Sequence, residues 1–197
     1  MDFRLSSELQ ALSNEAHEVG KMAAAQQEIR EDSWLVGTSR EFSQELAARN
    51  WLGMTWPVEQ GGGGRTALER FIVFEALIAE GAPVATSWFA DRQIGPTLLQ
   101  FGTQQQRDRW LPDIISGTSA WCIGMSEPAA GSDVAALQTS AVRVSESDGA
   151  ANNNVWRVNG QKVWTSGAAQ ADWCYLIART DPTAPPHAGL SEFVIDM

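Results

Sequence analysis

Four residues able to bind polar groups flank a sharp turn that directly follows a short apolar run. The apolar run, residues 121–125, is expected to be a buried strand; Pro128 prevents further strand pairing, and Gly131 allows another group to approach closely. A strand that ends in hydroxyls and free backbone N–H groups is suited to bind a phosphate or the polar edge of a cofactor. The alternative is a capped turn in which these side chains satisfy nearby backbone groups. The four residues are Ser126, Glu127, Ser132 and Asp133.

A second stretch repeats this arrangement of hydroxyl groups after an apolar segment. Asn159-Gly160 favours a two-residue turn of type I′, so the sequence predicts a hairpin between strands at 155–158 and 162–165. A flat heteroaromatic ring with a polar edge would fit both strand ends. The alternative is an ordinary sheet in which tryptophan and threonine side chains pair across strands. The second strand ends in a tryptophan and two hydroxyl residues, Trp164, Thr165 and Ser166.

These two motifs, in this order and at this separation, resemble the acyl-CoA dehydrogenase family, whose members are flavoenzymes that desaturate acyl-CoA thioesters. Residues 124–133, with the sequence GMSEPAAGSD, resemble the family's first signature. Residues 159–167, with the sequence NGQKVWTSG, resemble its next segment, which continues with ADW at 171–173 and ART at 178–180. The similarity extends from about Trp51 to the last residue, and the first 40 or so residues match only in helical character.

The resemblance implies an α+β fold with two domains in this chain. An N-terminal all-α domain, residues 1–118, would precede a small antiparallel, β-barrel-like middle domain, residues 119–197. A change from helical to strand spacing of the apolar residues near Ser119 agrees with this division. The family's C-terminal four-helix domain has no counterpart in the sequence. Because the family carries its catalytic glutamate and part of its FAD contacts there, the resemblance implies that this chain holds no catalytic residue and is inactive alone.

The resemblance also implies an FAD-dependent dehydrogenation at the α and β carbons of an acyl-CoA. Trp164 would pack on one face of the flavin, Ser126 would lie near its pyrimidine edge, and Ser166 would lie near its N5 atom. Ser132 would also contact the CoA part of the substrate. For each residue the alternative is a role in capping a strand end. The full set implied to bind the cofactor is Ile123, Met125, Ser126, Gly131, Ser132, Trp164, Thr165 and Ser166.

Three other features are weaker candidates for chemistry. Glu127 has the residue type of a general base, but the resemblance places it in the turn, where we expect its backbone rather than its charge to matter. Residues 60–66 contain four consecutive glycines but lack the Lys-Ser/Thr pair of a phosphate-binding loop, so we expect a flexible connector. His17 and His187 have no metal-ligand or nucleophile partner at a useful spacing, so no metal site is expected.

Partners and substrate follow from the resemblance alone. It implies an acyl-CoA substrate, an electron-transfer flavoprotein or similar electron acceptor, and a homo- or hetero-oligomer. Two alternatives stay open: an acyl-CoA oxidase or flavin monooxygenase on the same fold, and a half-subunit that binds flavin or a partner protein without turnover. In the family one wall of the acyl pocket comes from the helix that contains residues 90–99. The small residues Ala85, Ala90 and Gly95 could leave room there for a bulky acyl group.

Composition disfavours several other classes of protein. The net charge of −10 over 197 residues argues against a nucleic-acid partner. No apolar run of about 18 residues is present, so no transmembrane helix is expected. Residues 1–4 lack the features of a signal peptide, so we expect a soluble cytoplasmic protein. Cys122 and Cys174 lie in apolar runs and are expected to be buried, reduced thiols.

The spacing of apolar residues predicts a helical half followed by a sheet half. Helices are expected at 6–30, 39–49, 67–80, 85–101 and 103–116. Strands are expected near 121–125, 137–144, 155–158, 162–165, 173–180 and 193–197. Loops are expected at the polar residues 145–154 and the proline-containing residues 181–189.

Overall fold

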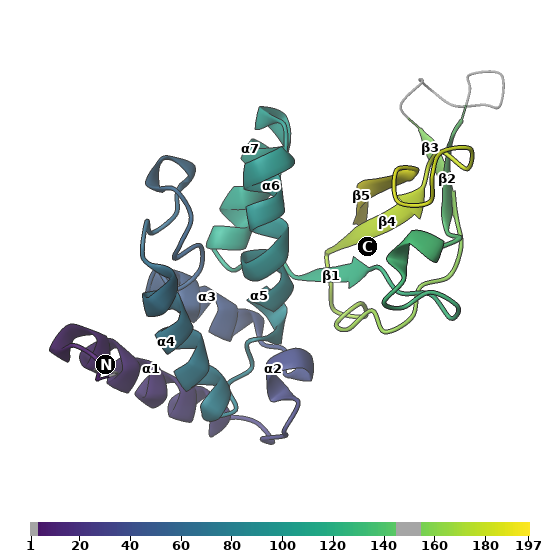
Figure 1. Cartoon of the computed structure of the whole chain (residues 1–197). Coiled ribbons are helices and arrows are strands. Elements are labelled where there is room, and N and C mark those ends of the chain that lie inside the picture. The colour runs from purple at the N-terminus through teal and green to yellow at the C-terminus, as the bar shows by residue number, and fades with distance from the viewer. Residues whose placement is uncertain (1–3, 145–154) are drawn as a thin grey trace. The chain divides into compact units, whose positions relative to one another are not determined.

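The structure is a computed structural model that describes residues 4–144 and 155–197. The chain divides into two compact units (Figure 1). The helical unit comprises Met1–Trp121 with Ala169–Ala171, and the sheet unit comprises Cys122–Ala168 with Asp172–Met197. The loop expected at 145–154 lies outside the described residues. The predicted order, helices first and strands second, is confirmed.

The helical unit is built from helices that mostly begin at hydroxyl caps. The side-chain oxygens of Ser6, Ser39, Thr66 and Thr103 each accept a hydrogen bond from a backbone N–H of the first helical turn. This satisfies N–H groups that have no partner within the helix. The α-helices are α1 (Ser7–Ala24), α2 (Ser33–Val36), α3 (Arg40–Ala48), α4 (Ala67–Ala79), α5 (Ala85–Phe89), α6 (Gly95–Phe101) and α7 (Gln104–Ile115), with a 3-10 turn η1 (Val58–Gln60) before α4.

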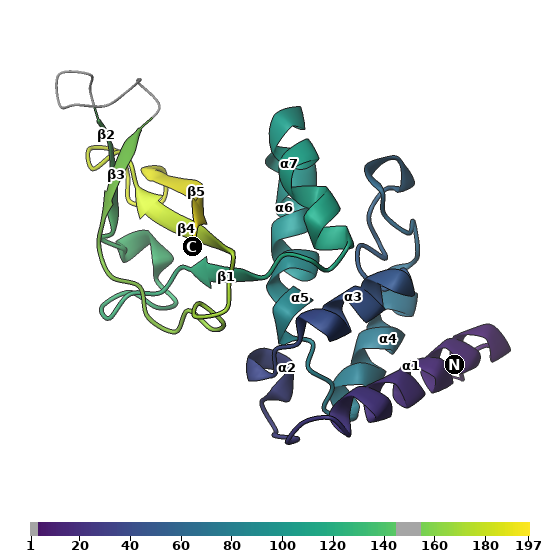
Figure 2. The ribbon, with the colours of Figure 1, turned by 180° about the vertical axis from the view of Figure 1, so that it is seen from behind.

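The contact between α1 and α4 forms a large part of the helical core (Figure 2). Gly20 lets the two helices approach closely, because a Cβ atom there would lie 3.0 Å from the Glu80 side chain. Helix α1 ends at Ala24, earlier than predicted, and Gln27 beyond it donates a hydrogen bond of 3.1 Å to the carbonyl of Gly81, just past α4. The end of α1 therefore coincides with the end of its packing partner. Buried residues in this region include Ala16, Val19, Val73 and Leu77.

The fourth predicted helix is one helical column with a π-helical segment in its middle (Figure 1). The π-helix η2 (Ala90–Ile94) separates α5 from α6. Pro96 at the start of α6 has no N–H to donate, so a regular α-helical bonding pattern cannot pass through this point. At Gly95 a Cβ atom would lie only 2.0 Å from the ring of Trp56. The room that the sequence suggested at Gly95 is therefore filled by Trp56, and that expectation is wrong.

The sheet unit contains a mixed sheet. Strands β1, β4, β2 and β3 are neighbours in that order, and β5 also pairs with β4. The pairs β2–β3 and β4–β5 are antiparallel as expected, but β2 meets β4 in parallel where Ser140 faces Arg179. In the part of the chain that the structure describes, the strands do not close into a barrel. The strands are β1 (Trp121–Gly124), β2 (Ser140–Arg143), β3 (Trp156–Asn159), β4 (Trp173–Arg179) and β5 (Leu190–Asp196), with a 3-10 turn η3 (Val134–Ala136) before β2.

The predicted hairpin at Asn159-Gly160 is wrong. Strand β3 pairs with β2 instead, and residues 162–165 do not form a strand. Gly160 has a φ of 159°, which is extended backbone rather than a type I′ turn. Its missing side chain serves a close approach, since a Cβ atom there would lie 2.3 Å from the Thr139 hydroxyl. The chain therefore continues past β3 toward the segment that follows β1.

Candidate functional site

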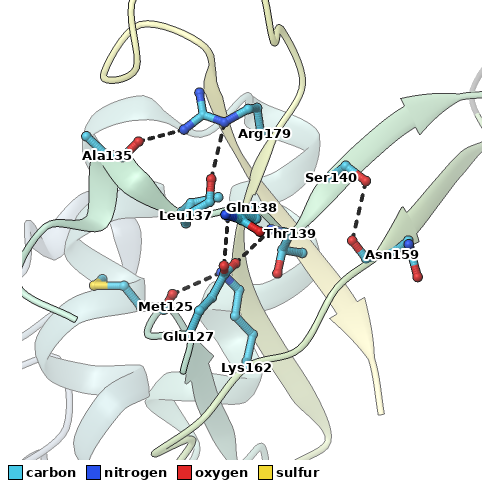
Figure 3. Close-up of polar contacts among 10 residues, drawn as sticks. All are labelled: Met125, Glu127, Ala135, Leu137, Gln138, Thr139, Ser140, Asn159, Lys162 and Arg179. Carbon is cyan, nitrogen blue, oxygen red and sulfur yellow. Dashed lines mark hydrogen bonds and ion pairs between the residues drawn. The ribbon is translucent and has the colours of Figure 1, made fainter. Parts of the chain in front are cut away.

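The two hydroxyl-bearing motifs lie side by side in the sheet unit. The N–H of Val163 donates to the carbonyl of Ser126 at 2.9 Å. The ammonium of Lys162 donates to the carbonyl of Met125, also at 2.9 Å (Figure 3). These two bonds fasten the segment that begins after β3 to the segment that follows β1. The side chains of Met125 and Ser126, like that of Ile123 in β1, are half-buried.

Glu127 joins three separate segments at this point (Figure 3). Its carboxylate accepts hydrogen bonds from the backbone N–H groups of Gln138 at 2.7 Å and Thr139 at 2.8 Å. It also forms an ion pair of 3.0 Å with Lys162. Because Glu127 is only 9% exposed, this carboxylate is a buried charge that is both paired and hydrogen-bonded.

The same contacts make Glu127 a poor general base. Burial alone would raise the pKa of Glu127, but the polar groups of Thr139, Gln138 and Lys162 outweigh burial and lower the pKa to about 2. A carboxylate with so low a pKa has little tendency to take a proton from a substrate. The low pKa agrees with the expectation that Glu127 is not a general base. The expectation that its backbone rather than its charge matters is incomplete, because the charged side chain itself makes these contacts.

The backbone of Glu127 closes the turn that carries the rest of the first motif. Its N–H donates to the carbonyl of Ala130 at 2.8 Å, and its carbonyl accepts from the N–H of Ala130 at 3.1 Å. Gly131 and Ser132 follow this turn and are exposed. A Cβ atom at Gly131 would meet no other atom within 4 Å. The structure thus leaves open space at Gly131, one of the residues that the resemblance assigned to the cofactor.

Trp164 is the most unusual residue of the second motif. Its backbone is left-handed, with a φ of 59°, and its side chain is 89% exposed. A left-handed backbone is an outlier for a bulky residue, and such strain often occurs where a ligand binds. Burial does not stabilise this indole, so packing does not explain its position. The arrangement presents a flat aromatic surface to the surroundings of the sheet unit.

The hydroxyl next to this tryptophan lacks a partner. The Oγ1 atom of Thr165 is buried and makes no hydrogen bond within the described residues. A buried polar group without a partner is destabilising, and ligands often satisfy such groups. Ser166 follows and is half-buried, and a Cβ atom at Gly167 would meet no other atom within 4 Å. An exposed indole, an unpaired hydroxyl and open space at two glycines fit a flat ring with a polar edge, which describes a flavin.

Two thiols lie in the strands next to the first motif. Cys122 in β1 and Cys174 in β4 are buried and free, which confirms the prediction. A hydrogen bond between the two thiols raises the pKa of Cys122 and lowers that of Cys174. Gly124 lies against this pair, since a Cβ atom there would be 3.2 Å from the Cys174 sulfur and 3.5 Å from a side-chain carbon of Lys162. The glycine therefore permits the close packing of β1, β4 and the Lys162 side chain.

Lys162 is the residue that sequence reasoning missed. Its side chain is 10% exposed, which is rare for a lysine. The chain has only two lysines, Lys21 and Lys162, and only the second lies within one of the two motifs, two residues before Trp164. That placement was a usable signal. The hairpin prediction drew attention away from this residue, because it placed Lys162 as the first residue of an ordinary, exposed strand.

The helical unit contains a cleft of about 690 Å³ between α4 and the column of α5, η2 and α6. Asp91 is 1% exposed at its edge and pairs with Arg70 at 2.6 Å, while its other oxygen accepts the N–H of Gly53 at 2.7 Å. The guanidinium of Arg70 also lies over the ring of Phe74. The cleft has the size of many ligand sites and an apolar lining. Its apolar lining includes Phe71, Phe74, Ile78, Ala79, Trp88 and Pro96.

Two negative findings apply to the described residues. Between residues 4 and 144 and from 155 onward, no helix is long and apolar enough to cross a membrane. Within the same ranges, no three or more His, Cys, Asp and Glu side chains gather in a way that could hold a metal ion.

Comparison with known proteins places both halves of the chain. A family model described as "Acyl-CoA dehydrogenase, N-terminal domain" matches residues 6–118, and one described as "Acyl-CoA dehydrogenase, middle domain" matches residues 122–197. "Acyl-CoA dehydrogenase IpdE1" of Mycolicibacterium smegmatis is 42% identical over 160 residues, which are 80% of this chain and 41% of the relative.

Solved structures agree with this result. "Tcur3481-Tcur3483 steroid ACAD" is 35% identical, with a TM-score of 0.86 over 100% of this chain and 49% of its own. "Crystal structure of the ChsE4-ChsE5 complex from Mycobacterium tuberculosis" is 33% identical, with a TM-score of 0.84 over 100% of this chain and 49% of its own. The chain therefore spans about half the length of these structures.

Proposed function

The chain belongs to the acyl-CoA dehydrogenase family, and we propose that it supplies the flavin-binding part of an enzyme that oxidises acyl-CoA thioesters with FAD. One observation carries the proposal: the strained, exposed Trp164 stands beside the unpaired hydroxyl of Thr165, where the two motifs meet. Among the residues that the structure describes, burial does not account for an aromatic ring in this strained position, whereas a flat, partly polar ligand would use both groups.

We assign the binding roles as follows. Trp164 stacks on the ring system, and the hydroxyls of Thr165 and Ser166 bind polar atoms along its edge. Ile123, Met125 and Ser126 line the side given by the first motif. The exposed turn with Gly131 and Ser132 approaches the phosphate-bearing part, because turn N–H groups and hydroxyls bind anions. Ser132 also contacts the CoA portion of the substrate.

The bound flavin would supply the electron acceptor for the removal of two hydrogens from neighbouring carbons. The chain's own residues bind and orient the ring. We assign no proton-accepting residue in this chain, because the buried and ion-paired Glu127 is unsuited to that role. The proposal therefore separates cofactor binding, which this chain performs, from the proton transfer of the complete reaction.

For the substrate we propose an acyl-CoA with a bulky, steroid-like acyl group. The support is the likeness to a structure titled "steroid ACAD", at 35% identity and a TM-score of 0.86. The two solved structures described above are each named for two proteins. We therefore also propose that the chain acts within an assembly of two different chains, and that an electron-transfer flavoprotein or similar acceptor reoxidises the flavin.

The experiment that tests the proposal is a titration of the purified chain with FAD, followed by flavin fluorescence and the visible spectrum. We expect saturable binding with a changed flavin spectrum. We also expect Trp164→Ala to weaken binding about tenfold, the scale of an aromatic stacking contact. Phe101→Ala is the matched control, because Phe101 is also an exposed aromatic residue, at 73%, and belongs to the helical unit. Failure of the wild-type chain to bind flavin would overturn the proposal.

Addition of acyl-CoA to the flavin-loaded chain tests the separation of roles. The CoA thioester of a steroid carboxylic acid and butyryl-CoA serve as probes. We expect no bleaching of the flavin by either thioester with this chain alone. Bleaching would place the proton-accepting residue within these 197 residues and would contradict the assignment. In the complete assembly, bleaching is expected with the steroid thioester and little with butyryl-CoA.

A further inference from the structure

The buried ion pair between Glu127 and Lys162 has no place in the binding site as assigned so far. We propose that this pair is a positioning pair, which holds Trp164 and Thr165 in the strained arrangement that receives the flavin ring. The inference rests on the proposed flavin site. It adds two residues that act through Trp164 rather than by contact with the ligand.

The first argument is the place of the pair in the chain. Lys162 lies two residues before Trp164, and the residue between them, Val163, is bonded through its N–H to Ser126. The Lys162 ammonium has two fixed acceptors, the Glu127 carboxylate at 3.0 Å and the Met125 carbonyl at 2.9 Å. The backbone that enters Trp164 is therefore fixed at two consecutive residues.

The second argument is strain. A left-handed backbone at a tryptophan persists only where its surroundings force it, because the extended and helical conformations are lower in energy. The Trp164 side chain is 89% exposed and contributes little packing. On the far side, short-range bonds continue the turn, from the N–H of Ser166 to the carbonyl of Trp164 and from Ala168 to Thr165. Among the described residues, the bonds of Lys162 and Val163 thus connect Trp164 to the segment that follows β1.

The third argument is that the same carboxylate organises both halves of the site. Glu127 belongs to the first motif and closes the turn that leads to Gly131. Its side chain reaches Lys162 of the second motif and the N–H groups of Gln138 and Thr139. A change at Glu127 is therefore transmitted to both motifs, whereas a change at Lys162 affects mainly the second.

Hydrogen exchange of the ligand-free chain tests the positioning directly. We expect Lys162→Met to speed exchange of the amides at 162–168 about tenfold or more, because local opening becomes easier. Amides of β4 and β5 should keep their wild-type rates. The matched control is Lys21→Met, which removes the other lysine and an exposed ion pair with Glu18 at 2.9 Å. Lys162→Arg keeps the charge and should restore most of the protection.

Flavin affinity provides the second measurement. Lys162→Met should weaken FAD binding about tenfold, and in a Trp164→Gly background it should cause a clearly smaller loss, because most of the effect of the pair passes through the indole and only the part that passes through Thr165 remains. Glu127→Gln should weaken FAD binding at least as much as Lys162→Met does. If Glu127→Gln does not fold, Lys162→Met alone still tests the positioning role. Equal losses in both backgrounds, or unchanged exchange at 162–168, would overturn the positioning role.

The two proposals fail in different ways. A wild-type chain that binds no FAD, with faster exchange at 162–168 in Lys162→Met, would end the flavin assignment and keep the positioning pair. If the wild-type chain binds FAD, and the Lys162 and Glu127 variants show wild-type hydrogen exchange and wild-type FAD affinity, the flavin assignment stands and the positioning role is overturned.

Discussion

Asp91 in the helical unit and Glu127 in the sheet unit are buried carboxylates with closely similar contacts. Each accepts hydrogen bonds from the backbone of a distant segment, Asp91 from Gly53 and Glu127 from Gln138 and Thr139. Each also pairs with one cation, at 2.6 Å for Asp91 and 3.0 Å for Glu127. Judged by these contacts alone, the two carboxylates would have the same role.

The difference lies in what each carboxylate holds in place. Gly53, which Asp91 binds, stands between Leu52 and Met54, both of which are buried in the core. Lys162, which Glu127 binds, precedes an 89% exposed tryptophan and an unpaired hydroxyl. The first arrangement stabilises a packed loop. The second uses the same chemistry beside an exposed indole and a buried hydroxyl that the described residues leave without a partner, which is typical of a binding site.

Asp91→Asn gives the largest expected effect on stability. Loss of the charge leaves Arg70 without its buried partner, so the free energy of unfolding should fall by about 3–5 kcal/mol. Denaturant unfolding followed by circular dichroism measures this change, with Asp32→Asn as control because Asp32 pairs with Arg30 at the surface. If both carboxylates served the binding site, FAD affinity of the folded Asp91 variant would also fall; we expect it to stay within about twofold.

Glu127 should make the free energy of unfolding depend on pH in the acidic range. Its pKa is about 2 in the folded chain against an ordinary value of 4.5, so the folded state binds this proton less readily than the unfolded state. The stabilisation is complete above the ordinary pKa and is lost as the pH falls through 4.5 toward 2.

Glu127→Gln should therefore lower the free energy of unfolding by about 3 kcal/mol at neutral pH. It should also flatten the decline of stability between the two pKa values. Unfolding curves measured at a series of acidic pH values test this prediction. A decline as steep in Glu127→Gln as in the wild type would assign the acid sensitivity to other carboxylates.

Two glycines should separate packing from binding. Gly95→Ala places a Cβ atom 2.0 Å from the Trp56 ring and should lower the free energy of unfolding by about 2 kcal/mol. Gly131→Ala meets no atom within 4 Å and should leave it within about 0.5 kcal/mol. FAD affinity should show the reverse order, with the loss confined to Gly131→Ala. Equal stability losses in the two variants would mean that the space at Gly131 is already filled.

Local patterns predicted most of the helices because their signals are short-range. The Thr66 and Thr103 caps each stand three residues before a Glu or Gln that completes a capping box, and the helices begin there. The π-helical segment at Ala90–Ile94 did not follow from periodicity, because the spacing of apolar residues on either side continues without a break. It reflects Pro96, whose missing N–H interrupts the regular α-helical bonding pattern.

The site was predictable by residue type but not by geometry. The motifs around Ser126 and Trp164 suggested a flat, polar-edged ligand before any contact was known. The expected hairpin at Asn159-Gly160 failed because Gly160 packs against Thr139, a contact between residues far apart in the sequence. The strained backbone of Trp164 and the pairing of Lys162 with Glu127 depend on such contacts, which composition and spacing do not contain.

The central claim is that Trp164 keeps a strained backbone for the sake of a bound flavin. Trp164→Gly removes the indole and permits the left-handed conformation without cost. We expect its free energy of unfolding to stay equal to that of the wild type or to rise by up to about 1 kcal/mol. We expect its FAD affinity to fall at least about tenfold. A variant that binds FAD as tightly as the wild type, or that loses stability as a core residue would, contradicts the account.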